Sequence, residues 1–151
     1  MPAKFYNIIR NKSNFMLLSY TWGIVMTILG FIVSIPFSIY CRYVKDISEQ
    51  KGYCTYFRFG KSWGGFSLGP YCFVSKTAKI KTLEHEQGHS LQNCLYGPLM
   101  LIFSLCSVIR YHYRNIRENI NIPCKSEYDD FWFEGQATSW GNELFNNANK
   151  K

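Results

Sequence analysis

The chain has 151 residues, of which 47% are hydrophobic and 18% aromatic, and its formal net charge is +7. This length allows one domain, or one small domain together with membrane segments. The basic residues are scattered and form no dense Lys/Arg run, which argues against a nucleic-acid-binding arm and fits a protein beside an anionic lipid surface. We therefore expect a lipid bilayer as a partner and no nucleic acid.

The cysteines exclude two familiar motifs, because none of the six forms the C-x-x-C pair of zinc ribbons and thioredoxin-like proteins. Several lie in apolar runs, where a cysteine usually behaves as a small buried hydrophobic residue. Cys54 and Cys72 lie on either side of a glycine-rich stretch, and a disulfide between them is left open.

The first third of the chain has a basic tail, residues 1–14, followed by an uncharged run, residues 15–41. A helix needs about 20 apolar residues to cross the hydrocarbon of a bilayer, and this run is longer. It is also long for the apolar part of a signal peptide, and no A-x-A cleavage site follows it. The sequence therefore predicts one transmembrane anchor and a membrane location. Basic residues lie close to both ends of the run, so the positive-inside rule leaves the orientation open.

Aromatic and β-branched residues within 53–74 predict strands. The glycine-rich stretch 60–65 predicts a hairpin turn, and Gly69-Pro70 predicts a bulge or bend. Proteases commonly hold substrate as an added β-strand, so the stretch GFSLGPYCFV is a candidate edge for such binding.

The segment KTLEHEQGHS, residues 81–90, contains His85, Glu86 and His89 in the order H-E-x-x-H. It lies in a predicted helix, so the two histidines share one face, one turn apart. Two imidazoles at that spacing can reach one Zn²⁺ at about 2.0–2.1 Å. Glu86 lies beside them but off their ridge, where it can bind the zinc-held water and act as general base. Gly88 is costly inside a helix, which indicates close approach by another element or by substrate.

A catalytic zinc also needs a third protein ligand and an open position. Glu134 is the best candidate, because a large aromatic run precedes it and an unpaired carboxylate would be costly to bury there. Ala137, one turn later, is small enough to let two helices approach closely. The sequence therefore predicts a second, C-terminal helix that brings Glu134 to the two histidines, and we expect that helix to begin near Ser126.

Residues 94–109 form a second uncharged run, which is interrupted at Gly97-Pro98. A full crossing would place the H-E-x-x-H histidines and Glu134 on opposite sides of hydrocarbon that is about 30 Å thick. The sequence therefore predicts a re-entrant or membrane-surface helical hairpin, which is possible where protein covers the backbone. His112, just beyond this run, is a candidate replacement ligand or oxyanion donor, although an interfacial role explains it more simply.

The H-E-x-x-H motif, followed by Glu134-x-x-Ala137 on a second helix, resembles the gluzincin metallopeptidases. Among them it looks most like the membrane-associated Ste24/HtpX type, and the resemblance covers only the two motif helices. It implies that a zinc-activated water attacks a peptide carbonyl.

One position departs from the family pattern, which often continues E-x-x-A-D where this chain has Thr138. The Asp of that pattern usually partners a ligating histidine. Asp129, Asp130 and Glu143 are left open as its substitute.

The predicted fold is an α-rich membrane protein. It has one N-terminal transmembrane helix, a short β-hairpin, the H-E-x-x-H helix, a re-entrant or membrane-surface apolar segment at 94–109, and a C-terminal ligand helix. Residues 42–151 then form a metallopeptidase-like domain behind the anchor.

The predicted function is hydrolysis of peptide bonds, with Glu86 as the general base and three Zn²⁺ ligands, His85, His89 and Glu134. Membrane-proximal peptide or protein substrates follow from the predicted location alone. The alternative is a non-catalytic zinc-binding membrane protein that acts as a sensor, chaperone or scaffold. A partner subunit or a second copy of the chain is left open as a way of completing the site.

Overall fold

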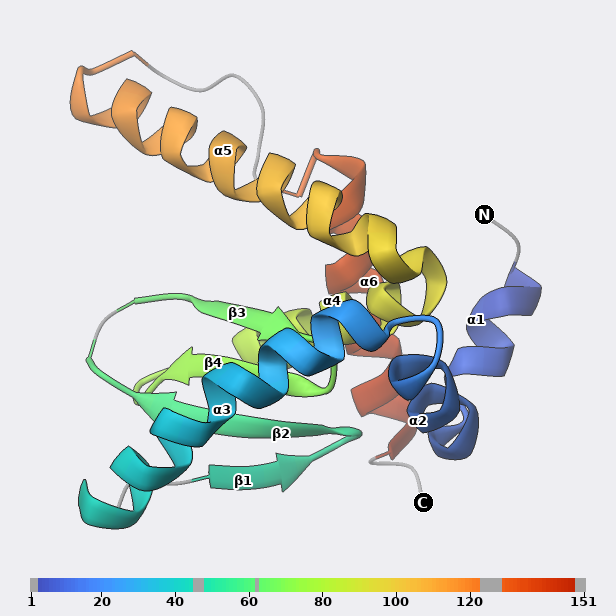
Figure 1. Cartoon of the computed structure of the whole chain (residues 1–151). Helices are drawn as coiled ribbons and strands as arrows, with labels where there is room; N and C mark the ends of the chain where they lie inside the picture. The colour runs from blue at the N-terminus through green and yellow to red at the C-terminus, as the bar shows by residue number, and fades with distance from the viewer. Residues whose placement is uncertain (1–2, 45–47, 62, 123–128, 149–151) are drawn as a thin grey trace.

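The computed structural model describes residues 3–44, 48–61, 63–122 and 129–148 (Figure 1). Ser126, where the last helix was expected to begin, lies outside these residues. In chain order the elements are α1 Ala3–Ile9, α2 Lys12–Tyr20, α3 Ile24–Val44, β1 Ser48–Lys51, β2 Cys54–Phe59, β3 Gly65–Leu68, β4 Tyr71–Ser75, α4 Ile80–Tyr96, a 3₁₀ turn Gly97–Leu99, α5 Met100–Asn119 and α6 Trp132–Ala148.

The four strands form one sheet in the order β1-β2-β4-β3. β2 pairs with β1 in antiparallel fashion and with β4 in parallel fashion, while β3 and β4 are antiparallel. Two β-hairpins are present, and neither has its turn at 60–65. β1 and β2 are joined at Gly52-Tyr53, and β3 and β4 at Gly69-Pro70, where Gly69 has a φ of +59°. β2 and β3, which flank the stretch 60–65, do not pair with each other, because β4 lies between them in the sheet. Residues 72–75 of β4 are all buried, so this strand lies inside the sheet, covered on both faces.

The sheet lies between α3 and α4 (Figure 1). Successive side chains of β4 point to opposite faces. The Phe73 ring packs 5.2 Å from that of Phe37 on α3, whereas Cys72 contacts Ser90 on α4 at 3.5 Å. Cys54 on β2 and Cys72 on β4 are free buried thiols on parallel strands.

In place of one continuous helix over 15–41, the structure has α2 and α3, which meet at 88°. The bend lies at Gly23, which is so close to α4 that an added Cβ would lie 2.3 Å from Asn93 Nδ2. Asn93 donates to the Gly23 carbonyl at 3.2 Å, and the Trp22 indole donates to the Leu95 carbonyl at 3.2 Å. These polar contacts hold the bend against α4.

The described part of the basic segment expected as a tail, residues 3–14, is also built into the body. Its helix α1 and the start of α2 bury Tyr6, Ile9 and Phe15 in the main core. The Tyr6 ring packs 5.6 Å from that of Trp140 on α6. The N-terminal helices therefore help to hold α6 in place.

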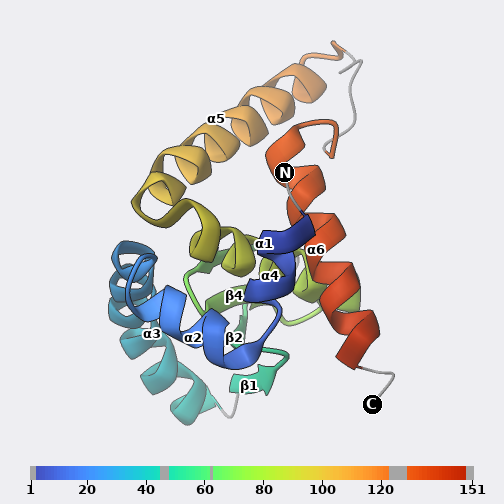
Figure 2. The same cartoon turned by 90° about the vertical axis from the view of Figure 1, so that its right-hand side faces the viewer.

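α4 and α5 fold back on each other at the 3₁₀ turn, where the sequence predicted a break. Gly97 has a φ of +54°, and an added Cβ there would lie 2.4 Å from the Trp22 indole nitrogen. A straight helix would put His89 and Ser107 about 27 Å apart, at about 1.5 Å per residue. Instead, both contact the carboxylate of Glu134. Both views show α5 standing away from the sheet (Figures 1 and 2).

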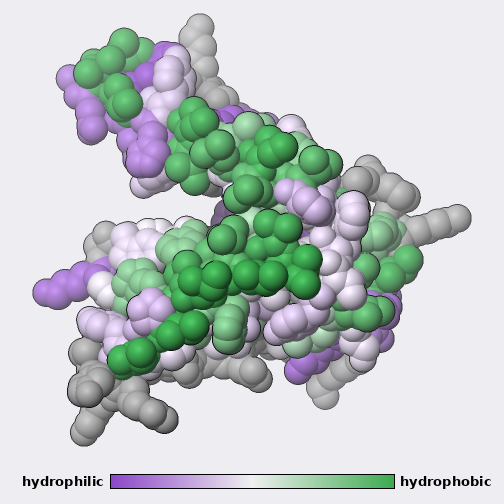
Figure 3. Space-filling model, viewed as in Figure 1, coloured by the Kyte–Doolittle hydropathy of each residue, from purple (hydrophilic) through white to green (hydrophobic). Residues whose placement is uncertain are grey.

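By length and composition, the helical stretch Ile80–Asn119 is long and apolar enough to cross a membrane. The bent pair α2–α3 is a second candidate if it is counted as one span. Only 17% of the apolar window in Ile80–Asn119 is buried, so this window is not a core helix of the body. Figure 3 shows apolar surface over α3 and over the near end of α5 on the same side of the molecule. On α3 the exposed apolar residues include Ile24, Val25, Ile28, Phe31, Ile32, Ile35 and Ile39.

Candidate metal centre

The backbones of α4 and α6 are in direct contact where the two helices cross. A Cβ added at Gly88 would lie 1.8 Å from the Ala137 carbonyl oxygen, and one at Gly141 would lie 1.7 Å from that of Glu84. No side chain fits at either glycine. This contact accounts for the glycine inside the H-E-x-x-H helix and for the small residue opposite it. It also brings the first turn of α6 against the histidine face of α4.

Three atoms that could bind one metal ion converge at this crossing. Glu134 Oε2 lies 3.1 Å from His85 Nε2 and 3.2 Å from His89 Nε2, and the two imidazole nitrogens are 3.1 Å apart. In a tetrahedral zinc site with bonds of about 2.0–2.1 Å, neighbouring ligand atoms lie about 3.3–3.4 Å apart. The three atoms therefore nearly form one face of such a tetrahedron. In the part of the chain that the structure describes, this is the one group of His, Cys, Asp or Glu residues placed to hold a metal.

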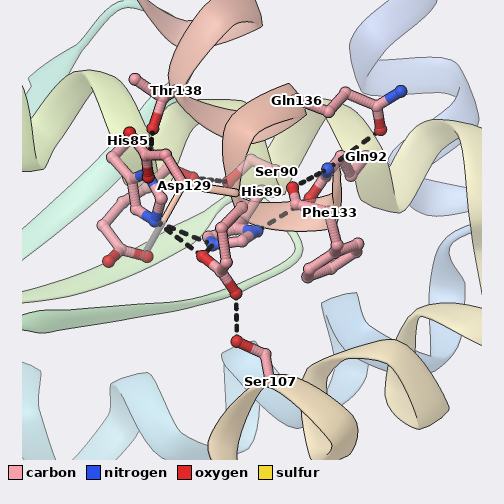
Figure 4. Close-up of polar contacts among 11 residues, drawn as sticks. His85, His89, Ser90, Gln92, Ser107, Asp129, Phe133, Gln136 and Thr138 are labelled. Atoms are coloured by element: carbon pink, nitrogen blue, oxygen red, sulfur yellow. Dashed lines mark hydrogen bonds and ion pairs between the residues drawn. The ribbon is translucent and has the colours of Figure 1, made fainter. Parts of the chain in front are cut away.

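A buried glutamine fixes the tautomer of His89 (Figure 4). Gln92 Nε2 donates to the Phe133 carbonyl at 2.7 Å and to Gln136 Oε1 at 3.0 Å. Its Oε1 therefore faces His89 Nδ1, at 2.8 Å, and can only accept. A neutral His89 consequently carries its proton on Nδ1, with the lone pair of Nε2 pointing into the site.

Thr138 orients the imidazole of His85, as Gln92 does that of His89. Its hydroxyl donates to Asp129 Oδ1 at 3.4 Å and lies 2.9 Å from His85 Nδ1. Because the only hydroxyl proton goes to the carboxylate, the imidazole Nδ1–H is the donor to Thr138. Of the three acidic residues left open as partners on this side, Asp129 is thus the one that reaches His85, through Thr138. Glu143 instead lies close enough to Tyr6 to raise the pKa of that phenol.

Glu134 is fully buried, and α5 supplies a hydrogen bond to it. Ser107 donates to Oε1, which leaves Oε2 to face the imidazoles. Burial raises the pKa of Glu134, but hydrogen bonds with His85, His89 and Ser107 outweigh burial and hold the pKa below its usual range. Without a metal, the hydrogen bonds with the imidazoles need a proton on an imidazole Nε2, and the one with His89 raises the pKa of that imidazole. When both imidazoles are neutral and carry their protons on Nδ1, three lone pairs converge in the centre of the site. A cation is the group that such an arrangement accommodates.

Glu86 is buried on the side of α4 that faces β3. An added Cβ at Gly65 would lie 2.7 Å from Glu86 Oε1, and Ser67 hydrogen-bonds to the same carboxyl. Glu86 Oε2 is buried without a hydrogen-bond partner, which is costly for a carboxylate. Burial raises the pKa of Glu86, and the nearby charges of His89 and His85 oppose that effect. The residue is thus a buried, incompletely satisfied carboxyl beside the three converging atoms.

All four residues selected from the sequence meet at this site, namely His85, Glu86, His89 and Glu134. His112 is exposed on α5, where its ring lies 5.5 Å from that of Tyr111, and it is not among the converging ligands. Two partners escaped the sequence analysis. Ser107 could have been noticed as a hydroxyl residue inside an apolar run. Gln92 could have been noticed as an amide residue three positions after His89.

Comparisons with protein-family models, with curated proteins and with solved structures found no match for this chain. The chemistry of the site is therefore inferred from its own residues.

Proposed function

We propose that this chain is a membrane-anchored, zinc-dependent peptidase. The observation that carries the proposal is the convergence of two imidazole nitrogens and one carboxylate oxygen, all 3.1–3.2 Å apart, at the crossing of α4 and α6. Three protein ligands with one open position are typical of catalytic zinc, whereas structural zinc usually has four. The uncharged run 15–41 and the exposed apolar face of α3 support the anchor.

Zn²⁺ in such a site supplies Lewis-acid chemistry, which polarises a peptide carbonyl and lets water attack at neutral pH. His85, His89 and Glu134 would hold the ion. Thr138 and Gln92 keep both imidazoles in the tautomer that presents Nε2. Ser107 keeps Glu134 Oε1 occupied, so that Oε2 serves the metal.

Glu86 acts as the proton carrier. Its unpartnered Oε2 can accept a proton from the attacking water, and its raised pKa lets it hold that proton. The same carboxyl then gives the proton to the leaving amine, so Glu86 acts first as the general base and then as the general acid. Without Glu86 the site would still bind metal but would lack a base.

β3 is suited to hold the substrate. It is an edge strand, and two of its residues, Gly65 and Ser67, lie against the Glu86 carboxyl. An extended peptide that added to this edge would place a peptide bond beside the general base. The membrane-proximal location of the site favours peptide segments close to the bilayer as substrates.

The zinc content of detergent-purified protein tests the proposal, with His89→Ala and Glu134→Ala beside the wild type. We expect one zinc per chain in the wild type and loss of zinc in both variants. Glu86→Gln is the matched control, because it should keep the zinc and lose peptide cleavage. Absence of zinc from the wild type after zinc is supplied would contradict the proposal.

Zinc binding without cleavage of any membrane-proximal peptide would favour the alternative of a non-catalytic zinc-binding membrane protein, or a requirement for a partner subunit. Mixing the chain with candidate partners, or measuring cleavage against protein concentration, separates these two cases. A second copy that completes the site would give activity that rises with the square of concentration.

A further inference from the structure

Helix α5 carries its apolar residues on the outside. Its residues Ser104, Ser107, Arg110, Arg114 and Arg117 are half-buried and share one side of the helix, the side on which Ser107 contacts Glu134. A helix packed on a water-soluble core shows the opposite arrangement. The outer face therefore requires a non-aqueous neighbour. Its exposed apolar residues are Leu101, Ile102, Leu105, Val108, Ile109, Ile116 and Ile120.

Three features indicate that this neighbour is a lipid bilayer. The apolar surfaces of α3 and α5 lie on the same side of the molecule (Figure 3). Exposed Tyr111 and Tyr113 follow the apolar run, as aromatic residues do at the level of lipid headgroups. Arg110, Arg114 and Arg117 line the polar face, which is typical of helices that lie in the interface of anionic membranes.

The arrangement also sets the orientation of α5. Its apolar stripe runs from Leu101 to Ile120, so only a helix that lies along the membrane surface immerses the whole stripe. A crossing helix would carry the three arginines into the hydrocarbon, where charged side chains are costly. α5 is thus suited to lie flat, with its apolar face in the acyl region.

The opposite face of the same helix meets the metal centre, where Ser107 donates to Glu134 Oε1. The first half of α5 touches the body, since the Phe103 ring packs 5.6 Å from Trp132 and 5.8 Å from Phe133. The Arg110 guanidinium lies 5.1 Å above the ring of Phe131, and beyond it the helix projects (Figures 1 and 2). Ser107 lies on the side of the helix opposite the exposed Leu105 and Ile109, so a contact that presses on the outer face presses Ser107 toward Glu134.

We propose that α5 is an interfacial helix whose apolar face lies in an anionic bilayer, and that this lipid contact holds Ser107 against Glu134 and tightens zinc binding. The second clause rests on the proposed function, because it requires the zinc site. Loss of a hydrogen bond to a metal ligand commonly weakens metal affinity by about 10–100-fold. We expect an effect of about tenfold here.

Cys106 provides a direct test of the lipid contact, because it is exposed on α5. The whole chain, with Cys41→Ser and Cys124→Ser, is labelled at Cys106 with a polarity-sensitive fluorophore and placed in vesicles that contain phosphatidylglycerol. We expect blue-shifted emission and quenching by brominated lipid. Emission typical of water would overturn the proposal, as would protection accompanied by dimer formation, which would assign the face to a second copy.

The coupling is tested by the zinc dissociation constant in nanodiscs of the same lipid, measured by competition with a chromophoric chelator. Ser107→Ala and the double variant Leu105→Gln/Ile109→Gln should each weaken zinc binding about tenfold. Ser104→Ala is the matched control for the inner face, and Ile32→Gln on α3 is the control for the outer face. Both controls should bind zinc as the wild type does.

The outcomes separate the two proposals. If the wild type binds zinc and neither Ser107→Ala nor the double variant changes the affinity, the coupling is overturned while the zinc site stands. If the wild type binds no zinc, both the proposed function and the coupling fail, and only the lipid contact reported by Cys106 remains. Because Ser107→Ala leaves the apolar face intact, it still tests the coupling if the double variant folds poorly.

Discussion

Helices α4 and α5 follow each other in the chain but are attached to the body in opposite ways. α4 touches α6 backbone to backbone at Gly88 and Gly141, and most of its length is buried. α5 buries only its first residue, and its outer face consists of exposed apolar side chains. The proposed metal ligands lie on the tightly packed pair, and the hydroxyl of Ser107 hydrogen-bonds one of them, Glu134, from the loosely attached helix.

This difference separates two parts of a small chain. One is a close-packed pair of helices that can hold side chains in fixed positions, and the other is a loosely attached helix whose surroundings can change. Metal ligands must be held within a few tenths of an ångström, and close-packed backbones provide that accuracy. An element that meets lipid must instead tolerate a changing neighbour. If α5 meets lipid as proposed, this division leaves the positions of His85 and His89 to the close-packed pair, while Ser107 and the ring contacts of Phe103 and Arg110 link α5 to the neighbourhood of Glu134.

The largest effect is expected where the two backbones touch. Gly88→Ala would place a methyl group 1.8 Å from the Ala137 carbonyl oxygen, so α4 and α6 must move apart. Overpacking of this kind costs about 1–3 kcal/mol or more. We expect a lower melting temperature together with loss of zinc. Gly64→Ala, where an added Cβ meets nothing within 4 Å, is the matched control and should change neither quantity.

The next effect separates catalysis from metal binding. Glu86→Gln should keep the zinc and lower the rate of peptide cleavage by about 10²–10⁴-fold, the usual contribution of a general base. Loss of zinc together with activity would instead make Glu86 a ligand or a structural residue. Metal analysis and single-turnover cleavage on the same sample distinguish these results.

Glu86→Gln should also change the pH dependence of stability in the metal-free protein. Burial raises the pKa of Glu86 from its usual 4.5, so the folded state holds this proton more tightly than the unfolded state. Ionised Glu86 therefore destabilises the fold at pH values above its folded pKa, and below pH 4.5 the effect disappears. We expect the Gln variant to melt higher than the wild type at neutral pH and to lose this advantage as the pH falls toward 4. An advantage that grew on acidification would contradict a raised pKa.

The sequence predicted which side chains lie together near His85 better than it predicted the fold. His85, Glu86 and His89 lie within one short motif, and the aromatic residues around Glu134 indicated that its carboxylate needed a partner. These are local signals, and Gly88 even indicated the close helix contact. The strand order and the bend at Gly23 depend on long-range pairing, namely β2 with β4 and Gly23 with Asn93. Periodicity and turn residues do not reveal which distant segments pair. For the same reason Ser107, on a helix that folds back, could not be assigned to Glu134.

A smaller effect is expected from the residues that orient the imidazoles. Gln92→Ala removes the acceptor of His89 Nδ1–H and frees the imidazole to change tautomer. We expect zinc affinity to fall about 10–100-fold, the usual cost of such a change. Thr138→Val should cost less, because Thr138 is more exposed and Asp129 lies close enough to take its place. Equal losses of zinc affinity would mean that both histidines depend on their partners to the same extent. A greater loss of zinc affinity for Thr138→Val would show that His85 is the more weakly held ligand.

The smallest effect on the free energy of unfolding should come from a substitution on the outer face of α5. Two leucines, one buried and one exposed, allow the comparison. Leu91 on α4 is fully buried, whereas Leu105 on α5 is 60% exposed. Leu91→Ala should therefore cost about 2–5 kcal/mol in the free energy of unfolding. Leu105→Ala should cost no more than about 0.5 kcal/mol in detergent, because the unfolded chain is solvated by the same detergent. Chemical unfolding of both variants under identical conditions decides the comparison. Equal costs would mean that protein covers Leu105, and the apolar face of α5 would then be an interface between chains rather than a surface for lipid.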